Sequence, residues 1–322
     1  MSTSTSKFDI KVTTKDFLSA LSASNSVMDK RSVNPTLGCV RLDIEDSNLL
    51  IQATDGSIFV KQAIGAQVFG VNCSVAVEGR LLERMLKGLN SDELSLKYLS
   101  ESNELLVTSF GFELKLLTLP IEDFPKFPRI YTDTTFEIPY KNLYELLSYT
   151  EFASSQEEIR YNLNGVCLHS EGDKICAAAT DVFRLATFFI ESSGEQKEFK
   201  IILPTKTIDL IRKIYSPNIE GHLVKAKISN NIIELSVLST LMVSKLIDGV
   251  FPQYSGLIPK NNQNKLVINK ALLASAIDRV SGINDERSRA VTINISQQEM
   301  EVSAYTQAKG EAKQSLSAEN FN

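Results

Sequence analysis

The chain has 322 residues, of which 43% are apolar and 23% are charged, and its formal net charge at pH 7 is −5. This composition is typical of a soluble globular protein, and no apolar run is long enough to span a membrane. The polar start of the chain has no apolar segment of the secretory type, so we expect a cytoplasmic protein without a membrane partner. The acidic balance excludes a protein that grips nucleic acid over its whole surface, but it is compatible with cations gathered on one face.

The first third of the chain predicts one domain over residues 1–128, with two helices against several short strands. The first helix covers residues 14–26, and a hairpin follows over residues 38–55. The second helix covers residues 78–89, with an apolar side and a side on which three cations recur at helical spacing. These cations are Arg80, Arg84 and Lys87. Because such stripes are usually solvated surface, this one alone indicates no partner.

The second third, residues 129–259, predicts the same order of elements. A helix over residues 141–152 precedes a hairpin whose strands cover residues 165–170 and 174–178, and a second helix covers residues 205–215. That helix again carries exposed cations, Lys206, Arg212 and Lys213. Two domains of one kind are therefore expected in tandem.

The last part, residues 260–322, predicts only half of a third such domain. A helix over residues 270–280, expected to bury Leu272, precedes two strands near residues 290–295 and 299–304. Counted by the period of the repeat, about 60 further residues would complete it. We expect a third domain whose C-terminal half is missing.

Two independent landmarks give the same period. Asp55 and Asp181, each preceded by Ala-Thr, are 126 residues apart, and Phe124-Pro125 and Phe251-Pro252 are 127 residues apart. A period of domain size predicts tandem copies of one domain, each of the α+β class with two helices and antiparallel strands.

Chemical motifs are sparse, and we predict a protein without catalysis, cofactor or metal. The sequence contains no glycine-rich phosphate loop and no nucleophile elbow. The only histidines, His169 and His222, are not at metal-ligand spacing, and the four cysteines form no C-x-x-C pair. A catalytic pair of Asp55 and Asp181 is conceivable, but an Asp that caps the turn after a strand explains both residues better.

Three stretches of the second repeat carry a resemblance to a known family: residues 160–165 (RYNLNG), residues 179–186 (ATDVFRLA) and residues 244–254 (SKLIDGVFPQY). The chain resembles the bacterial beta sliding clamps, the beta subunits of DNA polymerase III, from about Phe8 to its end. The resemblance implies the DNA clamp fold, with three similar domains per chain and two chains joined head to tail as a ring around duplex DNA. It implies a processivity factor that binds DNA without sequence specificity. The polymerase III catalytic subunit, the clamp loader and other proteins with a clamp-binding motif are the implied partners.

The resemblance also assigns roles to residues by position. DNA-facing residues would be Arg31, Arg80, Lys87, Tyr161, Asn162 and Lys206. The pocket for partner peptides would comprise Arg160, Leu163, Thr180, Val182, Phe183, Arg184, Leu185, Pro252 and Leu257. Ring closure would place Leu114 and Leu116 of one chain opposite Val280 to Ile283 of the other. For the apolar pocket residues, ordinary core packing is the alternative.

Two departures from the family pattern bear on function. Val182 and Phe183 stand where the family has a small and a polar residue, so we expect a narrower pocket. The incomplete third domain favours an alternative function, in which a truncated or divergent clamp binds partner peptides without closing a ring.

Overall fold

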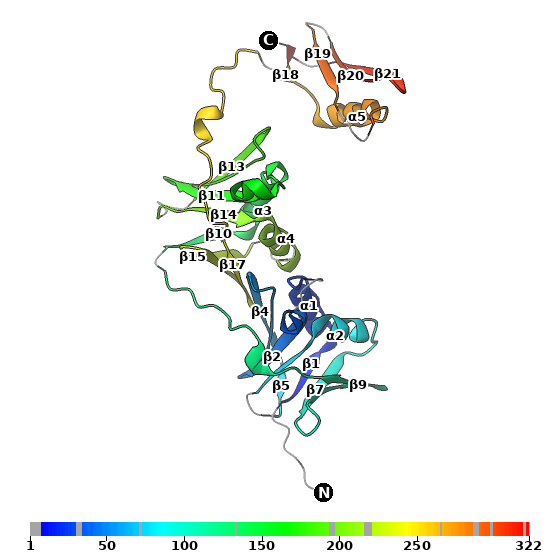
Figure 1. Ribbon diagram of the computed structural model, residues 1–322, viewed down its shortest axis with the longest axis vertical. Coiled ribbons are helices and arrows are strands. Elements are labelled where there is room, and N and C mark those ends of the chain that lie inside the picture. Colours follow the sequence, from blue (N-terminus) through cyan, green and yellow to red (C-terminus); the bar gives the residue numbers. More distant parts are fainter. Residues whose placement is uncertain are drawn as a thin grey trace. The chain divides into compact units, whose positions relative to one another are not determined.

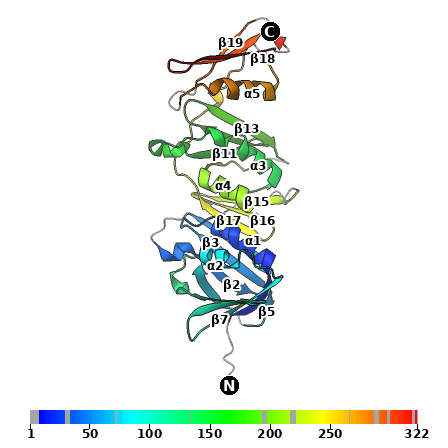
Figure 2. The same cartoon turned by 90° about the vertical axis from the view of Figure 1, so that its right-hand side faces the viewer.

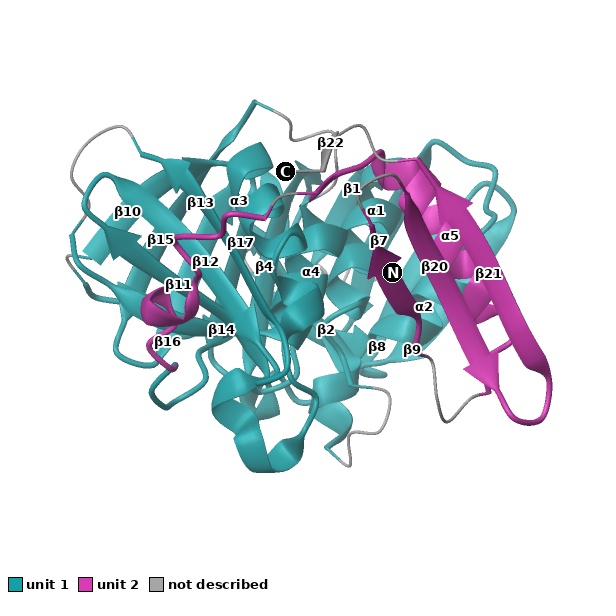
Figure 3. Cartoon of the chain, turned by 90° about the horizontal axis from the view of Figure 1, so that it is seen from above, with its two compact units in different colours: residues 1–251 teal, residues 252–322 magenta. Residues whose placement is uncertain are grey.

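The computed structural model forms two compact units, unit 1 over Met1–Phe251 and unit 2 over Pro252–Asn322 (Figure 3). The structure describes residues 8–29, 34–70, 73–132, 134–192, 197–215, 221–264, 266–285, 290–296, 299–317 and 320–321. The contact division falls after Phe251, and the predicted domain boundaries at residues 128 and 259 remain predictions.

Unit 1 contains two copies of one order of elements (Figure 1). The first copy comprises β1 (Asp9–Thr13), α1 (Thr14–Asn25), β2 (Cys39–Glu45), β3 (Asn48–Thr54), β4 (Ile58–Gly65), β5 (Gln67–Val68), β6 (Ser74–Glu78), α2 (Gly79–Leu86), β7 (Glu93–Leu99), β8 (Glu104–Ser109) and β9 (Phe112–Leu117). The second comprises β10 (Thr134–Pro139), α3 (Tyr140–Ser148), β11 (Gly165–Glu171), β12 (Lys174–Thr180), β13 (Leu185–Glu191), β14 (Lys200–Pro204), α4 (Thr205–Ile214), β15 (Leu223–Ser229), β16 (Ile232–Val237) and β17 (Thr240–Lys245). The repeat and the α+β class expected from the sequence are confirmed.

One antiparallel sheet runs through both copies. Its eight strands follow the order β10-β15-β16-β17-β4-β3-β2-β6, so that β17 of the second copy pairs with β4 of the first, with Thr240 opposite Gln62 and Ser244 opposite Ile58 (Figure 2). A five-stranded sheet of the first copy ends on β9, and a four-stranded sheet of the second has the order β13-β12-β11-β14. The two copies therefore share backbone hydrogen bonds, which ties them more firmly than side-chain packing alone.

Each copy has its own apolar core under its helices. In the first, Phe17 and Leu21 of α1 and Leu82 and Leu86 of α2 are fully buried against the strands. In the second, α3 and α4 fill the same place with Leu143, Leu146, Leu147, Ile208 and Ile211. This burial follows the periodicity of the sequence, since apolar residues at i, i+3 and i+4 share one face of a helix.

The helix predicted over residues 78–89 is shorter than expected. α2 ends at Leu86, Lys87 is already extended, and Gly88 has φ +88°. A glycine in the left-handed region just past the last turn is a common helix stop, because it has no Cβ to clash. Met85, which helical spacing places beside Leu82 and Leu86 on the apolar side, is 41% exposed. The prediction that three cations share one side of this helix is therefore wrong for Lys87, which lies beyond the end of α2.

Unit 2 contains the helix α5 (Lys270–Ser281) and a three-stranded sheet in the order β19-β20-β21. The strands of unit 2 are β18 (Leu266–Val267), β19 (Thr292–Ile295), β20 (Met300–Thr306), β21 (Gly310–Leu316) and β22 (Asn320–Phe321). The Asn269 side chain caps α5 by accepting hydrogen bonds from the amides of Ala271 and Leu272. The expected burial of Leu272 is wrong, since that side chain is exposed, and Ala276 and Val280 form the buried side with the sheet.

Candidate nucleic-acid interface and partner pocket

A Thr-Asp turn ends the third strand of each copy and has the same hydrogen bonds in both. In the first, Oδ1 of Asp55 accepts from the amides of Ser57 and Ile58 at 2.8 and 2.7 Å. In the second, Oδ1 of Asp181 accepts from the amides of Phe183 and Arg184 at 3.0 and 2.9 Å. Both carboxylates cap a turn, so the structural interpretation of the repeated Asp is confirmed.

The two turns differ at their third residue. Gly56 has φ +88°, and its counterpart Val182 has φ +81°. A β-branched residue rarely adopts this left-handed region, because its Cβ approaches the following carbonyl too closely. The hydroxyl of Thr180 accepts a hydrogen bond from the Val182 amide at 3.0 Å and helps to hold it there. The second turn thus carries an exposed apolar residue in a strained backbone.

Charge around the second turn is locally paired. Nε of Arg184 donates to Oδ2 of Asp181 at 3.0 Å, and its guanidinium lies over the Phe152 ring, 5.7 Å from the centroid. The amides of Arg184 and Phe183 and the Arg184 side chain hold the pKa of Asp181 below its ordinary value. Phe183 itself is 89% exposed.

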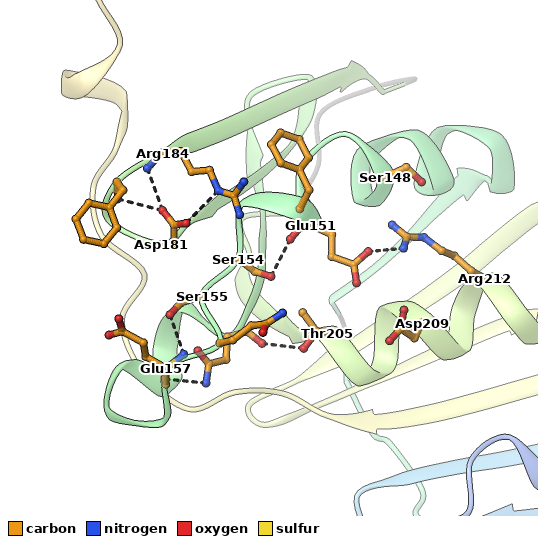
Figure 4. A pocket seen from close by; sticks show the side chains of 14 residues that line it. Ser148, Glu151, Ser154, Ser155, Glu157, Asp181, Arg184, Thr205, Asp209 and Arg212 are labelled. Carbon is orange, nitrogen blue, oxygen red and sulfur yellow. Dashed lines mark hydrogen bonds and ion pairs between the residues drawn. The ribbon is translucent and has the colours of Figure 1, made fainter. Parts of the chain in front are cut away.

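A cavity of about 960 Å³ opens beside this turn, entirely within unit 1 (Figure 4). Phe183 and Arg184 line one side, and Glu151 and Arg212 form an ion pair on the other. Burial raises the pKa of Glu151 even though Arg212 acts in the opposite direction. The Nε atom of Arg212 is shielded from solvent and has no hydrogen-bond partner within the described part of the chain. The wall of the cavity that α4 forms is therefore polar, and it includes this hydrogen-bond donor without a partner among the described residues.

The predicted pocket residues are divided between the two units. Phe183 and Arg184 line this cavity. Leu163 is buried, which agrees with the alternative interpretation of ordinary core packing, and Leu185 is half-buried. Val182 is 61% exposed, and Thr180 accepts the turn hydrogen bond described above. The remaining members, Arg160, Pro252 and Leu257, are considered next.

Arg160 forms an ion pair with Glu157, with Nε 3.6 Å from Oε2, and its Nη1 is shielded without a hydrogen-bond partner among the residues that the structure describes. Pro252 and Leu257 belong to unit 2 and are exposed there. The pocket assignment as a whole stays a prediction. Sequence reasoning did not include Phe152 or Glu151, since both lie just past α3 and only the fold brings them to the second turn.

The helices of the two copies form a row, because α1 contacts both α2 and α4 (Figure 1). On α4 the exposed residues Lys206, Asp209 and Lys213 follow helical spacing opposite the buried isoleucines. On α2 the exposed cation is Arg84, and Lys87 is exposed just after it. We call the row α2–α1–α4 the helix row.

The predicted DNA-facing cations differ in how available their charges are. Arg80 is half-buried and donates from Nη2 to the Met28 carbonyl at 2.6 Å. Lys206 forms an ion pair with Asp55 of the first copy, so it helps to join the copies. Lys87 is exposed, and Arg31 lies outside the described residues. Arg84, a member of the predicted cation stripe that the resemblance did not include among the DNA-facing residues, is exposed on α2, whereas Arg80 is half-buried.

Tyr161 and Asn162 lie on a short 3-10 turn, Glu158–Leu163, that packs against Gly249. Gly249 has φ +140°, and a Cβ there would lie 3.1 Å from Cβ of Asn162. The Asn162 side chain donates to the Val250 carbonyl at 3.0 Å, while Tyr161 remains 57% exposed. The Asp-Gly sequence before Phe251 is thus explained by this close approach.

The predicted ring-closure residues are largely internal. Leu116 is buried in the core of the first copy, and Leu114 packs against that core. Val280 is buried in unit 2, and Ile283 packs beside it. Any contribution of Val280 to a dimer would be through shape or backbone, and the assignment of these four residues stays a prediction.

Comparison with known proteins accounts for nearly the whole chain. Family models of the DNA polymerase III beta subunit match in order: the N-terminal domain at residues 8–128, the central domain at 137–253 and the C-terminal domain at 255–322. The beta sliding clamp of Rickettsia felis is 34% identical over 309 residues, which cover 95% of this chain and 81% of that relative. The chain belongs to the beta sliding clamp family.

Solved sliding clamps have the same fold. The clamp of Bartonella birtlesii, solved with griselimycin, has a TM-score of 0.91 at 31% identity and covers 98% of this chain and 85% of its own. The Bacillus subtilis clamp has a TM-score of 0.92 at 20% identity, with 98% and 85% covered, which bears on the fold alone. Sliding clamps are non-enzymatic processivity factors, and this beta subunit is one of them; the ring-free alternative is not favoured. Among the described residues of this clamp, no helix has the length and apolarity that crossing a membrane requires.

Proposed function

We propose that two copies of this clamp close head to tail around duplex DNA and hold the polymerase III catalytic subunit on it, in the cytoplasm and without a cofactor. The observation that carries this proposal is the pairing of β17 with β4, which joins one copy of the repeat to the next through backbone hydrogen bonds. The same strand pairing can form between two chains wherever the corresponding strands lie at the edges of their sheets.

The matching strands exist. In the repeat, β9 is the counterpart of β17 and lies at the edge of its five-stranded sheet. In unit 2, β21 is the counterpart of β4 and lies at the edge of its three-stranded sheet. β9 of one chain would therefore pair antiparallel with β21 of a second, a heterologous contact that closes after two subunits.

The joint within the chain also gives the register. The paired hairpins align Met242 with Leu114, because Leu235 opposite Met242 matches Val107 opposite Leu114. They align Val60 with Ala312, so Met242 opposite Val60 becomes Leu114 opposite Ala312. We expect the double variant Leu114→Cys with Ala312→Cys to form a disulfide-linked dimer on mild oxidation, because directly opposed Cβ atoms lie about 4.5–5.5 Å apart. A matched control, Leu114→Cys with Lys309→Cys, lies off the register and should stay largely uncrosslinked. Equal cross-linking of both pairs would contradict this joint.

DNA would lie along the helix row. Exposed cations there are Arg84, Lys87, Lys206 and Lys213, with Tyr161 and Asn162 on the neighbouring turn. Few cations on an acidic protein give weak phosphate contacts that do not depend on sequence, and these allow sliding. The polymerase, the clamp loader and other partners with a clamp-binding motif would dock at the second Thr-Asp turn. There the exposed Val182 and Phe183 offer apolar anchorage, and Arg160 and Arg184 offer polar contacts.

Retention on circular DNA tests the encircling function. The clamp, placed on a nicked circular plasmid by the cognate loader, should remain bound after gel filtration in moderate salt. Cutting the plasmid once should release it, because a ring slides off a free end. Retention that is equal on linear and circular DNA would mean a grip on DNA without encirclement.

A further inference from the structure

The face of the four-stranded sheet opposite α3 and α4 carries an unusual row of side chains. The pairing of β11 with β12 sets His169 directly opposite Cys176, and the pairing with β14 sets Lys200 on the other side of His169. Because side chains alternate along a strand, Glu171 points to the same face as His169. Val166 and Leu168 of the same strand point instead into the core.

Three metal-ligating groups meet on this face. A ring nitrogen of His169, a carboxylate oxygen of Glu171 and Sγ of Cys176 all lie within 4.8 Å of one another. Sγ of Cys176 is 3.8 Å from Oε2 of Glu171. In a tetrahedral zinc site with bonds of about 2.0–2.3 Å, neighbouring ligand atoms lie about 3.5 Å apart. The sulfur and the carboxylate already meet this distance, and the widest pair must close by only about 1 Å.

We propose that His169, Glu171 and Cys176 form a binding site for one Zn²⁺ ion on the outer face of the β11–β12 hairpin. A thiolate, an imidazole and a carboxylate form a donor set that suits zinc rather than magnesium or calcium, which prefer oxygen alone. Three protein ligands leave the fourth position to water. The ion would clip together the two strands of the hairpin.

The surroundings are compatible with a bound cation. Nδ1 of His169 donates to the Ser170 carbonyl at 3.4 Å, so in the neutral ring the lone pair is on Nε2. The two flanking ammonium groups are directed elsewhere. Nζ of Lys200 donates to the Phe251 carbonyl at 3.1 Å, and Nζ of Lys174 lies over the Phe189 ring, 4.6 Å from its centroid.

Binding requires that the thiol lose its proton. Burial, with Glu171 beside it, raises the pKa of Cys176 to about 11, so the metal-free side chain is a neutral thiol at pH 7. A coordinated Zn²⁺ overrides this preference, because its charge favours the thiolate. As the Zn–S bond forms, the thiol proton passes to the buffer, and binding should release about one proton per ion.

The test titrates the full chain, without a histidine tag and freed of metal by chelator, with Zn²⁺ and with Co²⁺. We expect one ion per chain, a thiolate-to-cobalt charge-transfer band, and a zinc binding heat that changes with the ionisation enthalpy of the buffer. Cys176→Ser should abolish the charge-transfer band. His169→Ala and Glu171→Gln should weaken binding by at least about tenfold, as even outer-shell partners do.

Cys73→Ser is the matched control, because Cys73 is a half-buried thiol outside the cluster, and this variant should bind metal as the original chain does. Thermal unfolding without metal checks that each variant folds. The proposal fails if the original chain shows no thiolate band, if the band survives Cys176→Ser, or if Cys73→Ser removes it. The outcome does not depend on DNA binding and leaves the clamp function untouched.

Discussion

The two Thr-Asp turns of unit 1 are built alike but differ in their contacts and in their exposure to solvent. Each Asp caps its own turn through two backbone amides, with bonds of 2.7–3.0 Å. The first turn is closed off: Asp55 is paired with Lys206 of the second copy, and its side chain is only 7% exposed. The second is open, with Phe183 89% exposed.

This difference shows how a duplicated module can divide its roles. The hydrogen bonds of the turn serve the fold of each copy and are kept in both. In the first repeat the carboxylate of Asp55 also joins the copies through Lys206, whereas in the second Val182 and Phe183 stay exposed, at the place where we propose that partners dock. Variants at matching positions of the two turns can separate these roles.

The largest expected effect is at the capping residues. Asp55→Ala removes the carboxylate that accepts from two backbone amides, and with it the ion pair to Lys206, from a nearly buried position. It should therefore lower the free energy of unfolding by about 2–4 kcal/mol. Asp181→Ala removes the same turn contacts from an open site and should cost clearly less. Urea unfolding of both variants measures the comparison, and equal losses would show that the joint to Lys206 adds nothing.

The next effect concerns the open turn. Phe183→Ala should weaken binding of a peptide that carries the motif of the cognate polymerase by on the order of 2 kcal/mol, because an exposed aromatic anchor is a typical hot spot. The unfolding free energy should change by less than about 0.5 kcal/mol. Phe189→Ala, on the sheet face, is the control for losing an exposed aromatic ring. Isothermal titration with the peptide decides, and unchanged affinity in Phe183→Ala would remove this residue from the pocket.

Backbone strain at the third residue gives a smaller effect. Gly56→Val should destabilise the clamp by about 1–2 kcal/mol, because it adds a β-branched side chain at φ +88°. Val182→Gly relieves that strain but makes the unfolded chain more flexible, so we expect a stability gain of at most about 1 kcal/mol. A loss of stability in Val182→Gly would show that the Val182 side chain makes stabilising contacts.

The smallest effect is the pH dependence of the open turn. The pKa of Asp181 is held below its ordinary 3.8, so the carboxylate stabilises the fold above that value and loses this contribution as the pH falls through the lowered pKa. Asp181→Asn should therefore lose stability less steeply than the original chain between about pH 4 and pH 2. Thermal unfolding across this range measures the slopes, and parallel curves would contradict the role of Asp181.

Local patterns in the sequence predicted much of the fold, because the repeat is present in the residues themselves. The buried stripe of α3, the β11–β12 hairpin and the turn-capping role of Asp181 all follow from spacing. The early end of α2 is also encoded in the sequence, because Gly88 is a residue type at which helices commonly stop.

Other features depend on contacts between distant segments. The Lys206–Asp55 pair joins residues 151 positions apart, and the Glu151–Arg212 pair forms only when the 3-10 turn after α3 meets α4. His169 and Cys176 were dismissed as metal ligands on spacing along the chain, although the hairpin sets them opposite each other. Sequence spacing says little about neighbours across a sheet.

The central claim is that DNA lies along the helix row and not on the sheets. Lysine acetylation rates, compared with and without nicked circular DNA, test it directly. Lys87 and Lys213 flank the row, whereas Lys225 and Lys227 point to the opposite face of the eight-stranded sheet and serve as internal controls. The account predicts that DNA slows acetylation of Lys87 and Lys213 several-fold and leaves Lys225 and Lys227 unchanged. Protection of Lys225 and Lys227, with Lys87 and Lys213 still reactive, would contradict it.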